Sequence, residues 1–326
     1  MAEFVIEVDG VEKRFVTRVK RGRLRRERRV VKAVDGISFA IERGTIVGYL
    51  GPNGAGKSTT VKMLTGILVP SGGRIRVAGL DPSRQRIELA RRIGVVFGQR
   101  VQLWWDLPLH ESFELLRHMY RVPVDRHRRN LAAFRELLEL DQFMTTPVRQ
   151  LSLGQRMRGE LTAAMLHDPE LLFLDEPTIG LDVVAKSRVR EFLTEVNRER
   201  GVTVLLTTHD LSDIERLCSR MLIIDHGRVI YDGGIEALKE RYGEERTLIV
   251  DLEEPAPPIE VDGARVERVE GPRQWLRFSR DDISASELTA AVAARARLVD
   301  LAIEEPHIED IVSRIYTEGV SPRAPR

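Results

Sequence analysis

The spacing of apolar positions changes several times along the chain, and each change predicts a different element. Near the start, alternating or continuous apolar runs predict short strands at residues 4–8, 11–15, 30–34, 37–41 and 44–50. An Asp9-Gly10 pair between the first two runs predicts a hairpin turn. Residues 57–67 then take a helical spacing, because Val61, Leu64 and Ile67 stand about one turn apart.

The middle of the chain changes from helices to alternating strands and helices. Residues 111–120 and 128–140 have helical spacing with no strand-like run between them, so a helical subdomain is expected at about residues 100–165. Farther on, three apolar strands alternate with two amphipathic helices, at residues 171–174, 185–200, 203–207, 211–218 and 221–225. This order predicts an α/β fold with a mostly parallel sheet and helices on both faces.

The composition changes again after the last of these strands. Residues 253–258 read Glu-Glu-Pro-Ala-Pro-Pro, which is typical of a stiff connector. Short strands and helices follow at residues 264–316, without a chemical motif. We therefore expect a domain at residues 1–245 and a small α+β accessory domain at residues 246–326. A regulatory or dimerising role and a purely stabilising one both remain open for the second domain.

A glycine-rich loop between the strand at 44–50 and the helix at 57–67 carries the strongest chemical signal. It fits the pattern G-x-x-x-x-G-K-[ST], which binds nucleotide phosphates between a strand and a helix. The glycines let backbone N–H groups turn toward an anion, and the helix start adds positive charge. Lys57 is placed to reach the β- and γ-phosphates and Ser58 to hold Mg²⁺. The predicted phosphate-binding residues are Gly51, Pro52, Asn53, Gly54, Ala55, Gly56, Lys57, Ser58 and Thr59.

Polar residues at the ends of three other strands extend this site. Asp175 and Glu176 follow the apolar run 171–174, so Asp175 is expected to hold Mg²⁺ and Glu176 to activate the attacking water. Gln99 ends the strand at 93–97, where it is placed to bridge Mg²⁺ and the attacking water. His209 follows Thr207-Thr208 and is expected to donate to a γ-phosphate.

A second anion-binding helix start lies away from this loop. Residues 151–155 read Leu-Ser-Leu-Gly-Gln and precede a helical stretch, so they offer a hydroxyl and flexible backbone N–H groups. The candidate contacts are Ser152, Gly154 and Gln155. The helix start and the glycine-rich loop together predict two separate sets of phosphate contacts.

Taken in order, these motifs resemble those of the ATP-binding subunits of ABC transporters, over roughly residues 4–235. Gly51 to Thr59 is similar to the Walker A loop, and Asp175-Glu176 ends a stretch similar to Walker B. The other matches are Gln99 to the Q-loop glutamine, residues 151–155 to the signature, Gly180-Leu181-Asp182 to the D-loop and His209 to the switch histidine. The signature departs from the family pattern because Leu153 replaces a glycine.

The resemblance implies more about fold and mechanism than the residues alone do. It implies a P-loop NTPase cassette with an antiparallel β portion and a helical subdomain, and a Phe15 side chain stacked on adenine. It also implies a dimer of two copies of this chain, with Mg²⁺ and ATP held between the P-loop of one copy and Ser152 to Gln155 of the other. Within that site, Lys57, Gln99, Glu176 and His209 would be catalytic, and Ser58, Gln99 and Asp175 would bind the metal.

Charge and apolar content narrow the choice of partner. The chain has 51 Lys and Arg against 50 Asp and Glu, so its net charge of +1 gives no general attraction to nucleic acid. No apolar run approaches the length of about 20 residues that spans a bilayer, so we expect a cytoplasmic protein, peripheral on the inner face of the membrane. Residues 18–29 hold eight Lys or Arg, which favours either a solvated insertion or contact with anionic lipid. The single cysteine, Cys218, is expected to be a small buried apolar residue.

The sequence in and around the motifs favours one group within the family. Residues 34–39, 178–182 and 304–311 resemble the ABC-2 type exporters, including drug- and viologen-efflux ATPases. That resemblance implies separate permease subunits, which would determine the transported substrate. Trp104 and Trp105 are either contacts for such a permease or core of the helical subdomain. A soluble ABC ATPase acting on nucleic acid or ribosomes, and a nucleotide-sensing regulator without turnover, remain as alternatives.

Overall fold

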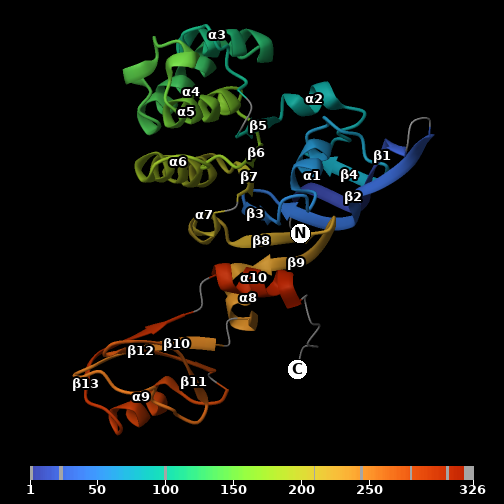
Figure 1. The fold of residues 1–326 in the computed structure, drawn as a ribbon. Helices are drawn as coiled ribbons and strands as arrows, with labels where there is room; N and C mark the ends of the chain where they lie inside the picture. Colours follow the sequence, from blue (N-terminus) through green and yellow to red (C-terminus); the bar gives the residue numbers. More distant parts are fainter. Residues whose placement is uncertain are drawn as a thin grey trace. The chain divides into compact units, whose positions relative to one another are not determined.

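The computed structural model describes residues 3–21, 25–98, 101–208, 210–242, 245–279, 281–305 and 308–318. Contacts within the chain define two compact units, residues 1–232 and residues 233–326. Each unit contains its own sheet and apolar core (Figure 1). Among the described residues, no helix combines the length and the apolar character needed to cross a membrane.

The first unit begins with an antiparallel sheet of three strands in the order β2-β1-β4. Its strands are β1 (Phe4–Arg21), β2 (Arg25–Glu42) and β4 (Gly72–Val77). The predicted hairpin turn at Asp9-Gly10 is wrong, because β1 runs through it as an irregularity in register between Val8 and Val11, with Gly10 at φ 56°. β2 and β4 pair with β1 on its two sides, so Asp9 and Gly10 are held inside a strand. A glycine with positive φ suits a β-bulge at such a position.

A six-stranded sheet forms the centre of the first unit, in the order β5-β6-β7-β3-β8-β9. The pairs β5–β6, β6–β7, β7–β3 and β3–β8 are all parallel, as the alternation of strands and helices predicts. Every residue of β3 and of β7 is buried. The strands are β3 (Ile46–Leu50), β5 (Ile93–Phe97), β6 (Leu171–Asp175), β7 (Thr203–Thr207), β8 (Arg220–Asp225) and β9 (Arg228–Gly234).

Apolar side chains join the two sheets of this unit into one core. Ile6 and Ile41 of the antiparallel sheet belong to the same buried cluster as Tyr49 of β3, Met63 of α1 and Phe173 of β6. The helices that accompany the sheets are α1 (Lys57–Leu64), α2 (Arg86–Ala90), α6 (Val183–Arg200) and α7 (Leu211–Leu217). The predicted α/β class with an added antiparallel portion is therefore confirmed.

A group of three helices interrupts the alternating part between β5 and β6. It comprises α3 (Leu109–Tyr120), α4 (Val124–Leu137) and α5 (Leu153–Met165), with short 3₁₀ turns at Asp141–Phe143 and Val148–Gln150. Figure 1 shows these helices grouped beyond the end of the sheet that carries β5 and β6. The buried ring of Phe134 on α4 meets Phe192 of α6 edge to face, with ring centres 5.6 Å apart. This contact attaches the helical part to the rest of the first unit.

The one thiol of the chain lies just past α7. Cys218 ends that helix and is buried, as its apolar neighbourhood predicts. Burial raises the pKa of the thiol to about 12, and the negative charge of Asp213 acts in the same direction. The thiol therefore stays protonated and serves as a small apolar side chain.

The second unit packs one antiparallel sheet against its own helices. The sheet order is β11-β12-β10-β13, and Leu248, Leu276, Phe278 and Leu288 are among the residues of its core. The sequence-based division at 245/246 differs from the structural one at 232/233, since α8 contacts α10 of the second unit. The elements are α8 (Ile235–Tyr242), β10 (Glu245–Leu252), β11 (Ala264–Glu270), β12 (Arg273–Ser279), α9 (Ala285–Ala293), β13 (Leu298–Glu304) and α10 (Ile308–Glu318).

Residues 253–258, predicted as a stiff connector, are part of the second unit and join β10 to β11. The buried side chain of Gln274 donates to the carbonyl oxygens of Ala256, at 3.0 Å, and Pro257, at 2.9 Å. Its own oxygen accepts from the N–H of Ile259 at 2.9 Å. Because this one amide satisfies backbone groups of the segment, the segment is attached to β12 of the second unit instead of linking domains.

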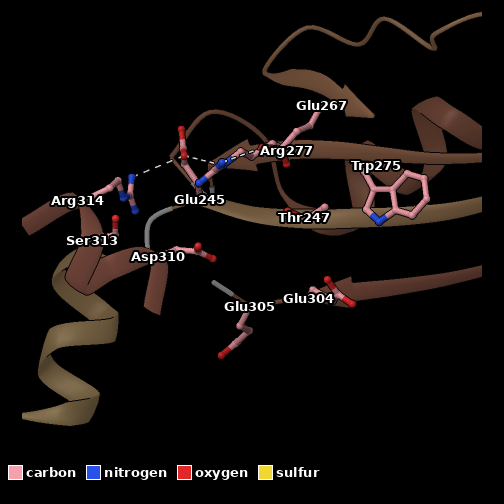
Figure 2. Close-up of a pocket in the computed structure, with 10 residues that line it drawn as sticks. All are labelled: Glu245, Thr247, Glu267, Trp275, Arg277, Glu304, Glu305, Asp310, Ser313 and Arg314. Atoms are coloured by element: carbon pink, nitrogen blue, oxygen red, sulfur yellow. Dashed lines mark hydrogen bonds and ion pairs between the residues drawn. The ribbon is translucent and has the colours of Figure 1, made fainter. Parts of the chain in front are cut away.

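A hollow of about 430 Å³ lies between the sheet and α10 of the second unit (Figure 2). Arg277 crosses it to Glu245 at 2.7 Å and to Glu267 at 3.0 Å, and Arg314 of α10 lies 3.7 Å from Glu245. Figure 2 shows Glu245 between the two arginines, with Trp275 at the opposite side. The two arginines thus pair with acids of the same hollow, and Glu245 connects α10 to β10.

Candidate functional site

The carboxyl ends of neighbouring parallel strands bring the predicted phosphate-binding residues together. The glycine-rich loop follows β3, Asp175 ends β6, and Thr207 ends β7, which lies between these two strands. In a parallel sheet, the loops at this edge form the ligand site because the strands and the helix starts both point there. Residues more than a hundred positions apart in sequence therefore meet beside the start of α1.

The loop itself needs glycine at two places for steric reasons. Gly56 has φ 110°, and a side-chain carbon added there would lie 2.5 Å from the carbonyl oxygen of Ala33. A carbon added to Gly51 would lie 2.4 Å from the carbonyl oxygen of Ile224. Gly56 also has no side chain to cap α1, so the first N–H groups of this helix keep their capacity to bind an anion.

Lys57 is folded back onto the loop that precedes it. Its side chain is only 7% exposed, and its ammonium group donates to the carbonyl oxygens of Gly51 and, at 3.2 Å, Pro52. Burial lowers the pKa of Lys57, while the carboxylates of Glu176 and Asp175 oppose this shift. A triphosphate would replace the two carbonyl oxygens with charged acceptors, which favour the protonated amine.

Asp175 joins β6, β7 and α1 through its two carboxylate oxygens. Oδ1 accepts from the hydroxyl of the fully buried Thr207 at 2.5 Å, and Oδ2 accepts from the hydroxyl of Ser58 at 3.4 Å. A carboxylate and a hydroxyl oxygen side by side are the ligand types that Mg²⁺ takes when phosphate oxygens and water complete its shell. The residues present therefore fit a magnesium ion at this position.

Glu176 occupies an unusual backbone conformation directly after β6. Its φ of 56° lies in the left-handed region, which costs a non-glycine residue roughly 1–2 kcal/mol. The N–H of Glu176 donates to the carbonyl oxygen of Thr207 at 2.9 Å, which holds this turn against β7. Backbone strain of this kind is typical of catalytic positions.

The second predicted anion-binding group lies at the start of α5, in the helical part. The Ser152 hydroxyl accepts from the N–H of Gln155 at 3.2 Å, and the Gln155 side chain accepts from the N–H of Ser152 at 2.9 Å. This reciprocal capping leaves the proton of the Ser152 hydroxyl free to be donated outward. Figure 1 places α5 with α3 and α4, away from α1, so the two phosphate-binding groups belong to different parts of the unit.

Leu153, the residue that departs from the family signature, packs beside the D-loop. Its Cδ2 atom lies 3.0 Å from the position that a side-chain carbon on Gly180 would take. Gly180 itself has φ 70°. The leucine therefore covers the one residue of the D-loop that has no side chain, and signature and D-loop are in direct contact.

The roles predicted for all the site residues remain predictions. Phe15 lies on β1 with its ring partly exposed and the ammonium group of Lys13 5.2 Å from the ring centre. Gln99 and His209 lie outside the described residues. The residue before Gln99 is held at the site, because the N–H of Gly98 donates to the carbonyl oxygen of Asp175 at 2.8 Å.

The sequence did not reveal a buried acid behind the site, Asp213 of α7. This fully buried carboxylate accepts from the hydroxyl of Thr178 at 2.5 Å and from Nε of Arg190 at 2.6 Å. It thus connects α7 to α6 and to the segment after Glu176. An aspartate in the first turn of a helix is ordinary in sequence, so no local signal marked it.

A parallel α/β sheet with a glycine-rich loop, a buried lysine and an aspartate at one edge defines a P-loop nucleoside triphosphatase. The family model described as "ABC transporter" matches residues 34–179. The daunorubicin resistance ATP-binding protein DrrA3 of Streptomyces coeruleorubidus is 37% identical over 250 residues, covering 77% of this chain and 74% of the relative. The chain belongs to the ATP-binding proteins of ABC transporters, and it is an ATPase subunit.

Two further relatives extend this likeness. The Nod factor export ATP-binding protein I of Rhizobium sp. (strain N33) is 31% identical over 316 residues, covering 97% of this chain and 98% of the relative. The dimeric post-hydrolysis structure of the ATP-binding cassette MJ0796 with ADP and Pi has a TM-score of 0.60 at 25% identity, covering 71% of this chain and 98% of that one. The nucleic-acid or ribosome alternative is therefore not favoured.

Replacing Lys57 by Ala tests the phosphate site. We expect ATP to bind about 10- to 100-fold more weakly, since a charge-assisted hydrogen bond contributes about 1.5–3 kcal/mol. Titration calorimetry with ATP measures the change. Lys62→Ala, on the same helix, is the matched control and should bind ATP as the parent does. Equal affinity for the Lys57 and Lys62 variants would contradict the assignment.

Proposed function

We propose that two copies of this chain close on two ATP molecules and that hydrolysis reopens them. The P-loop residues of one copy and Ser152, Gly154 and Gln155 of the other would hold each nucleotide. Lys57 and His209 would bind the γ-phosphate, Gln99 and Glu176 would orient and activate the water, and Phe15 would stack on adenine. Mg²⁺, held by Ser58, Asp175 and Gln99, would neutralise phosphate charge. The observation that carries this proposal is the arrangement of Lys57, Ser58 and Asp175 at one edge of the sheet.

The surface around the signature supports a second copy as the partner. Val183 and Val184, at the start of α6, are 84% and 70% exposed. Ile179 precedes them in the D-loop region, and Leu153 begins α5; both are also partly exposed apolar residues. Exposed aliphatic side chains next to a phosphate-binding helix start are suited to an interface that forms with the nucleotide. The structural relative described above is a dimer with nucleotide products bound.

Replacing Glu176 by Gln tests the dimer and the catalytic role together. The amide keeps the shape but cannot accept a proton, so turnover should fall about 10²- to 10⁴-fold. The ATP-bound protein should then accumulate as a stable dimer, and light scattering after gel filtration measures its mass. Adding Lys57→Ala to Glu176→Gln should return the protein to a monomer. Glu199→Gln, at the exposed end of α6, is the matched control and should turn over normally. A Glu176→Gln protein that remains a monomer in the presence of ATP would refute the proposed dimer.

We infer that the transporter is an ABC-2 type exporter and that its permease docks along α3. Relatives of this chain serve daunorubicin resistance and Nod factor export, as their names state. Trp104 and Trp105 precede α3 and are 36% and 50% exposed, so neither indole is fully in the core. Near the other end of α3, the exposed side chains of Met119 and, from α2, Ile87 line a groove of about 1030 Å³. Arg84, Arg86 and Arg91 also line this groove. Large, partly exposed aromatic and apolar side chains are typical anchors of protein–protein interfaces.

The tryptophan pair can be tested by substituting both residues with Ala. Interface tryptophans contribute about 2 kcal/mol or more when truncated, so the permease complex should weaken at least about 30-fold. The tagged chain is used to capture its complex from detergent-solubilised membranes, and the captured polytopic protein is identified by mass spectrometry. Val124→Ala, an exposed apolar residue of α4, is the control. A double variant that captures the permease as well as the control does would refute the interface.

We also infer that the basic residues 18–29 contact anionic lipid. Pairing with β4 ends at Glu12, whereas β1 and β2 stay paired as far as Arg21 and Arg25. The far part is therefore a two-stranded ribbon (Figure 1). Eight of its residues between 18 and 29 are basic, and Val16 and Val30, which face each other across the strands, are exposed. A basic ribbon on a transporter subunit is complementary to the negative inner leaflet, which implies a peripheral position on that face.

Substituting Arg25, Arg26 and Arg28 by Ser tests the lipid contact. Each arginine near an anionic surface contributes about 1 kcal/mol, so partitioning onto vesicles with phosphatidylserine should fall roughly 100-fold. Binding to purely zwitterionic vesicles should be weak for both proteins. Substituting Arg126, Arg128 and Arg129 of α4 in the same way is the matched control. Equal losses in the two triple variants would contradict the proposal. Tighter, steeply salt-dependent binding to RNA or DNA would assign the ribbon to nucleic acid instead.

We propose that the first unit, residues 1–232, contains the ATP-binding domain expected at residues 1–245, and that the second unit contains the accessory domain expected at residues 246–326. The similarity to the Nod factor export ATP-binding protein I of Rhizobium sp. (strain N33) spans 97% of this chain, so it includes both domains. This supports the presence of both domains in one ATP-binding subunit. The second domain carries its own core and sheet, as an accessory domain requires.

A further inference from the structure

Residues 101–105, which end at the two tryptophans, have no regular secondary structure, so side chains must satisfy their backbone. The N–H groups of Gln102 and Leu103 donate to Oε1 of Glu160, at 3.0 and 3.4 Å. The next N–H, of Trp104, donates to the buried hydroxyl of Ser112 on α3 at 3.3 Å. Three successive amides thus depend on two side chains for their acceptors, and leaving buried N–H groups without acceptors is costly.

Glu160 belongs to α5, about two turns after the signature serine, and is only 4% exposed. Its own carbonyl oxygen accepts from the side-chain amide of Gln102 at 3.2 Å, so the bonds run in both directions. The neighbouring Gly159 allows a close approach as well. A side-chain carbon there would lie 2.9 Å from Leu109 and 3.1 Å from Leu103. The segment therefore rests directly on the backbone of α5.

A carboxylate is an expensive choice for this buried position. An apolar side chain on α5 would fill the space without desolvating a charge. Burial raises the pKa of Glu160 to about 7, and the N–H groups of Leu103 and Gln102 oppose this shift. The positive charge of Arg156, one turn earlier on α5, also lowers the pKa of Glu160. What the carboxylate provides, and an apolar residue does not, is a firm acceptor for the segment.

We propose that Glu160 is a positioning residue that clamps residues 102–105 to the signature helix α5, so that movement of this helix upon ATP binding is transmitted to Trp104 and Trp105. The inference rests on the proposed function, which gives Ser152 a nucleotide contact in the dimer and the tryptophans a permease contact. Glu160 touches neither nucleotide nor permease in this scheme. It acts through the segment that it holds.

The clamp should depend on the charge of Glu160. The ionised carboxylate accepts from both N–H groups at Oε1 as a charged acceptor, whereas the protonated carboxyl keeps this oxygen as a neutral and weaker acceptor. The clamp is therefore tighter above about pH 7 than below it. Stability changes in the opposite sense. Because the folded protein holds this proton more firmly than the unfolded one, its stability falls as pH rises through the interval up to about 7.

The experiment uses the full chain with Trp275→Phe, which leaves Trp104 and Trp105 as its tryptophans, and with Glu176→Gln to prevent turnover. The change in tryptophan emission on adding Mg·ATP is measured between pH 6 and 8, together with ATP affinity. We expect Glu160→Gln to reduce this change at least about twofold at pH 8 and Glu160→Ala to reduce it further, with ATP affinity within about threefold of the parent. Glu136→Gln, an exposed acid of α4, is the matched control and should leave the signal unchanged.

Two additional readouts separate positioning from simple loss of structure. The ATP-induced signal of the parent should fall as pH drops through about 7, whereas that of Glu160→Gln should not depend on pH. The melting temperature of Glu160→Gln relative to the parent should rise with pH, although its ATP signal is smaller. Should Glu160→Ala fail to fold, the isosteric Gln variant still decides the question.

An unchanged ATP signal in Glu160→Gln, or a parent whose tryptophans do not respond to bound ATP, overturns the inference and leaves the proposed function standing. A parent that binds no ATP overturns the proposed function itself, and the inference with it.

Discussion

The parallel pairing of β6, β7 and β3 is the constraint on which the nucleotide site depends. It places Asp175 opposite Thr207 and brings both beside the loop that follows β3. At that edge the polar groups are satisfied by one another: Thr207 and Ser58 donate to Asp175, and Lys57 donates to carbonyl oxygens of its own loop. Binding a triphosphate therefore exchanges existing hydrogen bonds for charged ones, within a frame that the sheet already holds in place.

The parts of this site that can be predicted from sequence are those with local causes. The loop from Gly51 to Ser58 is recognisable because backbone crowding at Gly51 and Gly56 restricts both positions to glycine. Asp175 is recognisable because it ends a fully apolar strand. The Asp9-Gly10 pair shows the limit of such reasoning. The same two residues serve in a hairpin turn or a bulge, and the choice depends on β2 and β4, which come later in the chain.

Buried polar residues were beyond sequence reasoning for a related reason. Asp213 and Glu160 both lie on helices, where an acidic residue normally faces water. Only the approach of Thr178 and Arg190 to one, and of the segment after residue 100 to the other, decides that they are buried. The same holds for Gln274, whose amide turns the proline-rich residues 253–258 into part of a packed unit. In each case the determining contact comes from a distant part of the chain.

The two buried acids also suggest how the parts of the cassette stay coordinated. Asp213 connects α7 with α6 and the segment after Glu176, while Glu160 connects α5 with the segment that ends at the tryptophans. Leu153, packed over Gly180, connects the signature with the D-loop. Each contact lies between elements that carry different motifs, so the first unit has direct physical links between its signature, its D-loop and its nucleotide edge.

The burial of Cys218 has a practical consequence for following these parts in solution. A thiol whose pKa is about 12 provides almost no thiolate at neutral pH, and its position shields it from reagents. The natural chain therefore serves as its own unreactive background for chemical labelling. A single cysteine introduced on an exposed helix would accept a spin label or a dye selectively. In a dimer of two labelled chains, the distance between the two labels would report the proposed closing and reopening of the two copies.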